Sequence, residues 1–68
     1  MNAENILDLI HRAPFRPLEL ELDNGRKINV KHPDFILFAE SKRVAIVTEG
    51  DHFHLIDLEH VSTVHSAL

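Results

Sequence analysis

A segment of strictly alternating residues places the strongest constraint on what this chain can fold into. In residues 18–23, leucines alternate with acidic residues, which is the pattern of a β-strand with one buried and one solvated face. The turn-forming residues Asn24 and Gly25 follow at once, and residues 26–31 alternate again. We therefore predict an antiparallel β-hairpin over residues 18–31.

The length of the turn decides which residues pair in this hairpin. A two-residue turn at Asn24 and Gly25 would mix apolar and charged side chains on one face. A three-residue turn that starts at Asp23, with Gly25 in the left-handed conformation, separates them. It pairs Leu18 with Val30, Leu20 with Ile28 and Glu21 with Lys27. We predict the three-residue turn because it satisfies both faces of the hairpin.

An amphipathic helix is predicted before the hairpin, over about residues 3–13. Its apolar residues recur at helical spacing: Ile6, Leu9, Ile10 and Ala13. Asn2 is the candidate N-cap, because its side-chain oxygen can accept from free amides of the first turn. Pro14 cannot continue a helix and marks its end.

The rest of the chain is predicted to form short strands separated by tight turns. Residues 35–39 are apolar at every position, and residues 43–48 are nearly so. Two further strands are predicted over residues 52–56 and 61–65. Strands that are apolar on both faces are typically buried on both faces. One helix cannot cover so much apolar surface, so we expect part of it to meet another subunit.

The chain is long enough for one domain only. Its 68 residues are interpreted as a single domain, 1–68, with a helix at about 3–13 and a β-barrel at about 17–66. A tightly connected antiparallel meander of this size usually curls into a barrel, which removes exposed strand edges. The predicted fold class is mainly β, with an N-terminal α-helix followed by a five-stranded antiparallel small barrel.

Composition limits the classes of function. The chain has no cysteine, which excludes disulfides and thiolate metal sites. Its formal net charge is −4. Its seven lysine and arginine residues are spread thinly, which argues against duplex nucleic acid as a partner. Neither a signal peptide nor an apolar run of membrane-spanning length is recognisable. We expect a cytoplasmic protein with no membrane partner and no cofactor.

Two segments carry a family resemblance. Residues 18–25, which end in Asn24 and Gly25, are similar to the first strand and turn of the Sm-like (Hfq-like) family. Residues 59–64, Glu-His-Val-Ser-Thr-Val, resemble that family's Lys-His-Ala-Ile-Ser-Thr-Val segment but are one residue shorter. The resemblance implies an SH3-like or Sm-like barrel whose second strand bends at His32 and Pro33. The chain also resembles short uncharacterised bacterial proteins in its Pro-Phe-Arg-Pro and His-Pro-Asp-Phe segments, which implies no function.

The resemblance implies that His60 contacts a nucleotide, because the family's Lys-His pair lines a nucleotide pocket at the subunit boundary. Glu59 occupies the lysine position here and reverses the charge. The glycine that is usual in the family's bent strand is also missing. The family therefore implies RNA as a partner, but the negative charge of this chain does not support it. Ring assembly in the family implies edge-to-edge association through the strands around residues 52–56 and 61–64.

A histidine pair forms a candidate metal site. His52 and His54 lie two residues apart on a predicted strand and therefore project from the same face. Asp51, Asp57 and His60 are close in sequence. Two imidazoles and a carboxylate suit Zn²⁺ or another divalent ion. A polar strand face exposed to solvent explains the same pattern, so both interpretations stay open.

No enzyme motif frames the candidate nucleophile and bases of this chain. His11, Asp57 and Ser62 lack a nucleophile elbow, a glycine-rich phosphate loop or a spaced carboxylate pair. We therefore predict a non-enzymatic binding or scaffold module that forms a homo-oligomer through strand edges. Single-stranded RNA binding in an Hfq-like ring and histidine-based metal binding are the alternatives. The interface candidates are apolar strand residues: Ile36, Phe38, Val47, Ile56, Val61 and Val64.

Overall fold

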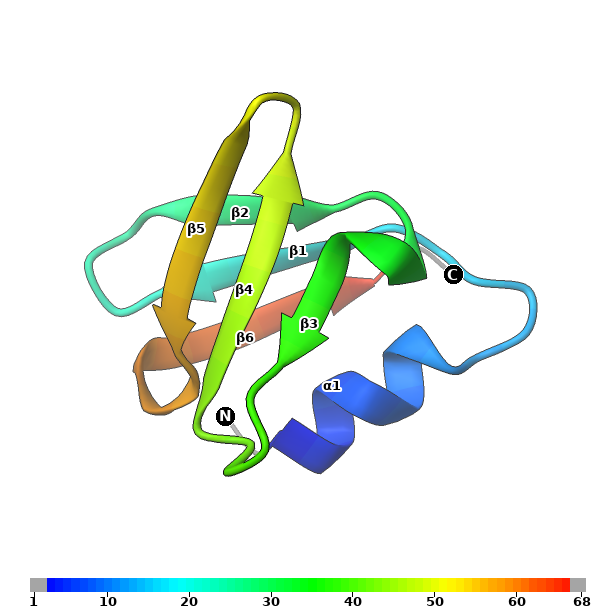
Figure 1. The fold of residues 1–68 in the computed structure, drawn as a ribbon, viewed down its shortest axis with the longest axis horizontal. Coiled ribbons are helices and arrows are strands. Elements are labelled where there is room, and N and C mark those ends of the chain that lie inside the picture. The colour runs from blue at the N-terminus through cyan, green and yellow to red at the C-terminus, as the bar shows by residue number, and fades with distance from the viewer. Residues whose placement is uncertain (1–2, 67–68) are drawn as a thin grey trace.

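One α-helix, six β-strands and two 3₁₀-helices follow one another along this computed structural model, which describes residues 3–66. The elements are α1 (Ala3–Ile10), β1 (Leu18–Leu22), β2 (Lys27–Val30), η1 (Pro33–Phe35), β3 (Ile36–Phe38), β4 (Val44–Glu49), β5 (His52–Asp57), η2 (Leu58–His60) and β6 (Val61–Ser66). Figure 1 shows α1 beside β3 and β6, with the strands stacked in two layers. The predicted mainly β fold with an N-terminal helix is confirmed.

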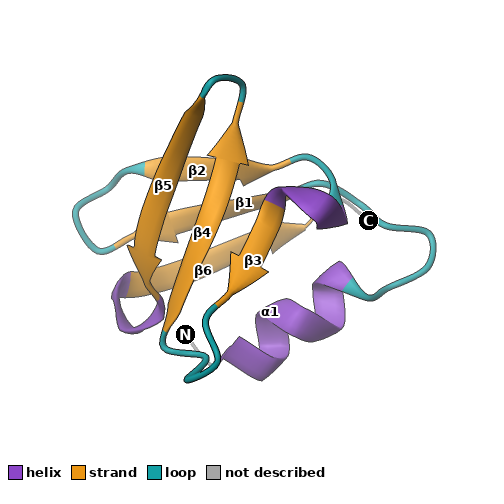
Figure 2. Ribbon diagram, viewed as in Figure 1, coloured by secondary structure: helices purple, strands orange, loops and turns teal. Residues whose placement is uncertain are grey.

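The strands form two antiparallel sheets of three strands each, in the orders β2-β1-β6 and β3-β4-β5. The sheets lie face to face and their strands cross steeply (Figure 1, Figure 2). Sheets packed in this way share one core between their inner faces. The prediction of five strands is corrected to six, and the described strands are not joined into a closed barrel.

The sixth strand arises because the predicted bent strand is divided into β2 and β3. Pro33 has no amide proton to donate to a strand ladder, and the chain forms the short helix η1 there. Nδ1 of His32 accepts a hydrogen bond from the Asp34 amide at 3.1 Å and caps η1. The break predicted at His32 and Pro33 therefore carries the chain from one sheet to the other.

The β1–β2 hairpin has the predicted register, with three residues in its turn. The paired residues are Leu18 with Val30, Leu20 with Ile28, and Glu21 with Lys27. Gly25 has a φ of 86°, a left-handed conformation that glycine adopts without steric cost. The Gly25 amide donates to the Leu22 carbonyl at 2.9 Å and closes the turn.

The core contains apolar side chains from both sheets and from α1. Its buried members are Ala3, Ile6, Ile10, Leu18, Leu20, Ile28, Val30, Ile36, Ala45, Val47, Ile56, Leu58 and Val61. No polar or charged residue is buried in the described part of the chain. No helix within residues 3–66 is long and apolar enough to cross a membrane.

The helix is shorter than predicted and ends at Ile10. The next amide, that of His11, still donates to the Leu7 carbonyl at 2.9 Å. Pro14 explains the early end, because in a continuing helix its ring would clash with the carbonyl four residues earlier, that of Ile10, and it has no amide to extend the ladder. Asn2, the candidate N-cap, lies outside the described residues.

The β3-β4-β5 sheet has one buried face and one exposed face, although its strands are apolar on both. Residues opposite one another across the sheet share a face, and Leu37, Ile46 and Leu55 stand opposite one another in a row. Their exposed fractions are 68%, 37% and 70%. Within this chain the other sheet and α1 cover only the inner face, and the expected contact of the remaining apolar surface with another subunit stays a prediction.

Candidate functional site

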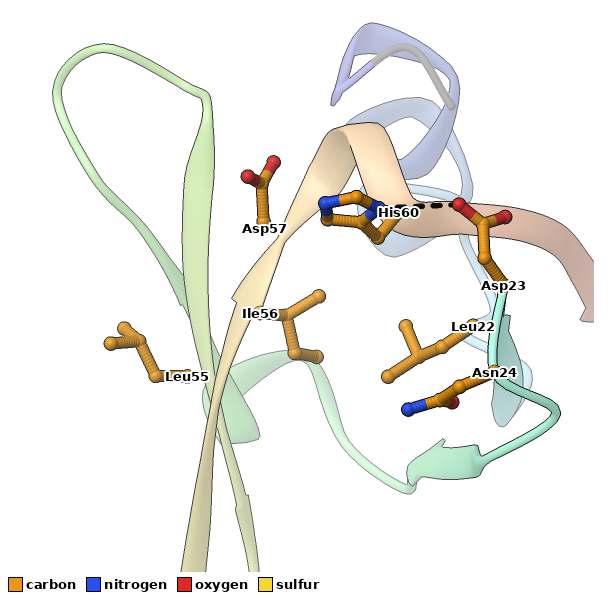
Figure 3. A pocket seen from close by; sticks show the side chains of 7 residues that line it. All are labelled: Leu22, Asp23, Asn24, Leu55, Ile56, Asp57 and His60. Carbon is orange, nitrogen blue, oxygen red and sulfur yellow. Dashed lines mark hydrogen bonds and ion pairs between the residues drawn. The ribbon is translucent and has the colours of Figure 1, made fainter.

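A surface pocket lies where the β1–β2 turn meets the end of β5 (Figure 3). Its volume is about 320 Å³. The lining residues come from two separate stretches of chain: Leu22, Asp23, Asn24, Leu55, Ile56, Asp57 and His60. Figure 3 shows Leu22 and Ile56 pointing toward one another, while Leu55 leaves β5 on the opposite side. The pocket therefore has an apolar floor and a polar rim.

His60 is held in this pocket by Asp23. Nδ1 of His60 lies 3.2 Å from Oδ2 of Asp23, and the Asp23 amide donates to the His60 carbonyl at 2.8 Å. The local turn also fixes the histidine, because Oδ1 of Asp57 accepts the Glu59 amide at 3.0 Å and caps η2. The Leu-Glu-His turn thus joins the end of β5 to the β1–β2 hairpin.

The charges around His60 are acidic. Asp23 and Asp57 line the pocket, and no lysine or arginine is among its lining residues. Glu59 lies outside the lining set, where Oε1 is 3.9 Å from an Arg43 guanidinium nitrogen. Two carboxylates beside a pocket repel a phosphate group and favour a cation or a neutral ligand. The structure therefore places His60 in a pocket without the positive charge that nucleotide binding usually needs.

The two candidate metal ligands have different surroundings. His54 is partly buried, and its Nε2 lies 3.1 Å from Oε1 of Glu49. His52 is exposed at the tip of the same hairpin, opposite Glu49 in the β4–β5 register. Within residues 3–66, no group of three or more His, Cys, Asp or Glu side chains could hold a metal ion. His54 is instead a hydrogen-bond partner of Glu49.

The Glu49–His54 contact predicts a pH dependence of stability. The hydrogen bond from His54 lowers the pKa of Glu49 below its ordinary value of 4.5, with a smaller contribution from Asn29. A carboxyl group with a lowered folded-state pKa stabilises the fold above its unfolded pKa, and this contribution is lost as pH falls through the folded pKa. We expect Glu49→Gln to be less stable than the wild type at neutral pH and equal to it once Glu49 is protonated.

Urea unfolding of both proteins over a pH series, followed by circular dichroism, measures this difference. His54→Ala is the control, because it removes the main cause and should return the Glu49 pKa toward 4.5. A constant gap between wild type and Glu49→Gln down to pH values well below 4.5 would contradict the assignment.

The six predicted interface candidates point inward. Four of them, Ile36, Val47, Ile56 and Val61, are buried in the core, and the remaining two, Phe38 and Val64, pack against it. None of the six is among the exposed large apolar residues. On β3, β4 and β5 the alternate positions carry exposed apolar side chains instead: Leu37, Ile46, Phe53 and Leu55.

We define the outer face as the exposed apolar side of the β3-β4-β5 sheet, formed by Leu37, Ile46, Phe53 and Leu55. Phe53 stands opposite Thr48 and is 71% exposed. Sequence reasoning recognised that β3 and β4 were apolar on both sides but did not decide which of their alternate positions face solvent. The polarity of His52 and His54 is a misleading signal, because these histidines lie on the side of β5 that carries the buried Ile56, while the apolar Phe53 and Leu55 face solvent.

The comparisons with known proteins give no relative for this chain. No protein-family model matches the sequence, no curated protein is similar to it, and no solved structure matches the fold. The geometry of the two surfaces described above therefore carries the functional argument alone.

Proposed function

We propose that this chain is a small non-enzymatic binding module that works by associating with itself. The outer face is the observation that supports this proposal. It leaves Leu37, Phe53 and Leu55 about 70% exposed, whereas a typical soluble monomer covers most of its large apolar side chains or scatters them singly.

The size of the chain also favours association. A domain of 68 residues buries a smaller fraction of its surface than larger domains do, so a partner subunit adds burial that its own core lacks. β5 and β6 are edge strands of their sheets, and unpaired edges are further surfaces on which a second chain can dock. Both features favour a self-associating scaffold over a monomeric enzyme.

Nucleotide and metal binding are not favoured by the described geometry. His60 is exposed in a pocket, but Asp23 and Asp57 give that pocket an acidic rim. His52 and His54 have no third ligand within residues 3–66. Self-association needs none of these residues and uses surface that the chain itself leaves uncovered.

Sedimentation velocity over a dilution series tests the proposed function. We expect the weight-average mass to rise from one copy toward a small oligomer as concentration increases, with a dissociation constant on the order of 10–100 μM. Mass should fall back on dilution, because a dissociation constant in this range describes a reversible contact. A single species of monomer mass up to about 1 mM would overturn the proposal.

A further inference from the structure

We infer that the free edge of β5 binds an extended peptide segment that carries a lysine or arginine, and that this basic side chain enters the pocket beside His60. The peptide adds to the β3-β4-β5 sheet as a fourth strand, antiparallel to β5. This inference goes beyond the proposed function, because it involves neither the outer face nor a second copy of this chain.

The main chain of β5 offers hydrogen-bonding groups on its open side. Within residues 3–66, β5 pairs only with β4, and opposite residues of an antiparallel pair alternate between hydrogen-bonded and non-hydrogen-bonded positions. The Leu58 amide donates to the Arg43 carbonyl at 2.9 Å, so Ile56, two places earlier, is also bonded to β4. The amides and carbonyls that point away from β4 belong to Phe53, Leu55 and Asp57.

The pocket beside His60 continues this open edge. Leu55, Ile56 and Asp57 form one of its sides. The Leu55 side chain leaves β5 on the opposite side (Figure 3), so Leu55 lines the pocket through its main chain. The β1–β2 turn projects beyond β5 in Figure 1 and forms the other side. An added strand therefore meets main-chain groups to bind and a cavity of about 320 Å³ beside them.

The same alternation decides which peptide side chain enters the pocket. A peptide residue beside Ile56 takes a non-hydrogen-bonded position, where opposite side chains are closest, and its side chain lies on the face of the sheet that carries Ile56. Ile56 and Leu22 point toward one another across the pocket (Figure 3), so this side chain lies over the apolar floor. The peptide residues on either side of it exchange hydrogen bonds with Leu55 and Asp57.

The charge of the pocket selects a basic side chain. Asp23 and Asp57 line the pocket. The lysine and arginine residues closest in sequence to the elements that form it lie outside the lining set: Arg26, Lys27, Lys42 and Arg43. Lysine and arginine carry their charge on an apolar stem, so the stem packs on the floor and the charge reaches the carboxylates of the rim. The pocket volume is near the lower end of the range of about 300–1,000 Å³ for ligand sites, which suits one side chain.

An NMR titration of isotope-labelled protein with a five-residue peptide tests the strand addition. The probe is Thr-Val-Lys-Val-Thr, acetylated and amidated at its ends. We expect a dissociation constant on the order of 0.1–1 mM and the largest amide shifts at Leu55 and Asp57. Methylation of either valine amide should weaken binding at least about 10-fold, because it removes a hydrogen bond to the edge. Methylation of the lysine amide, which points away from β5, is the control and should change binding by less than about 3-fold.

A second set of titrations tests the charge of the pocket. Norleucine in place of the peptide lysine keeps an apolar stem without the charge and should weaken binding about 3–10-fold. Asp23→Asn should cause a similar loss with the lysine peptide and little further loss with the norleucine peptide. Asp51→Asn is the control, because it removes the same charge from the exposed turn before β5, about 16 Å along the strand from Ile56. It should change binding by less than about 2-fold, and circular dichroism confirms that each variant is folded.

Each outcome decides the inference. It is overturned if no amide shifts at peptide concentrations up to about 5 mM, or if the largest shifts lie on the outer face. Equal losses from the valine and lysine methylations overturn the strand addition, and a norleucine peptide that binds as well as the lysine peptide overturns the selection by charge. Sedimentation velocity of the same protein reports self-association separately, so failure of the proposed function would leave this inference standing.

Discussion

Replacing Leu20 by alanine is expected to lower the free energy of unfolding by about 3–5 kcal/mol. Leu20 is fully buried, and β1, which carries it, pairs with β2 on one side and β6 on the other. Truncation leaves a cavity that neither neighbouring strand can fill without breaking its own ladder. A domain of 68 residues has a total stability of about 3–10 kcal/mol, so this single change removes a large part of it.

Leu55→Ala is the matched control, because it is the same substitution on a strand whose side chain is 70% exposed. We expect a change within about 0.5 kcal/mol, measured where the wild type is monomeric so that association does not contribute. Urea unfolding followed by circular dichroism suits both variants, because the chain has no tryptophan or tyrosine. Equal losses for the two variants would contradict the assignment of inner and outer faces.

Ile6→Ala is expected to cost about 2–4 kcal/mol, the second largest effect. Ile6 is fully buried in the same core cluster as the residues of both sheets. An isolated helix of eight residues is marginal in water, so α1 depends on this packing. The substitution should therefore destabilise the whole domain in one transition, and the loss should appear equally in signals from helix and strands.

Asp8→Ala, on the exposed side of α1, is the control for this prediction. Alanine has a higher helix propensity than aspartate, so stability should stay within about 0.5 kcal/mol of the wild type. Amide hydrogen exchange of β1 and β6 provides a second measurement. If Ile6→Ala loosened α1 alone and left the protection of the strands unchanged, the helix would be an appendage and not part of the core.

The β1–β2 hairpin shows how much of this fold the sequence predicts. Leucines alternate with acids in β1, so only one register keeps the apolar side chains together. Gly25 can adopt the left-handed conformation that the three-residue turn needs. Local pattern and turn chemistry agree here, and the observed pairing is the predicted one.

The candidate site was predictable only in its parts. His60 was singled out in sequence, but its contact with Asp23 joins residues 37 positions apart and depends on how the β1–β2 turn meets η2. The pocket exists because the two sheets leave a gap between that turn and β5. The pocket is acidic because the β1–β2 turn brings Asp23 to the end of β5, where Asp57 lies. Neither aspartate belongs to a sequence motif that would have predicted this.

By itself, the sequence determined the N-terminal helix, the hairpin register and the break at Pro33, because each depends on residues within a few positions of one another. Only the tertiary structure decided which face of the β3-β4-β5 sheet is buried. Side chains alternate with a period of two, and a strand that is apolar at every position gives neither face an advantage. The choice came from the opposite sheet and α1, which cover the face that carries Ala45 and Val47 and leave Leu37 and Leu55 in solvent.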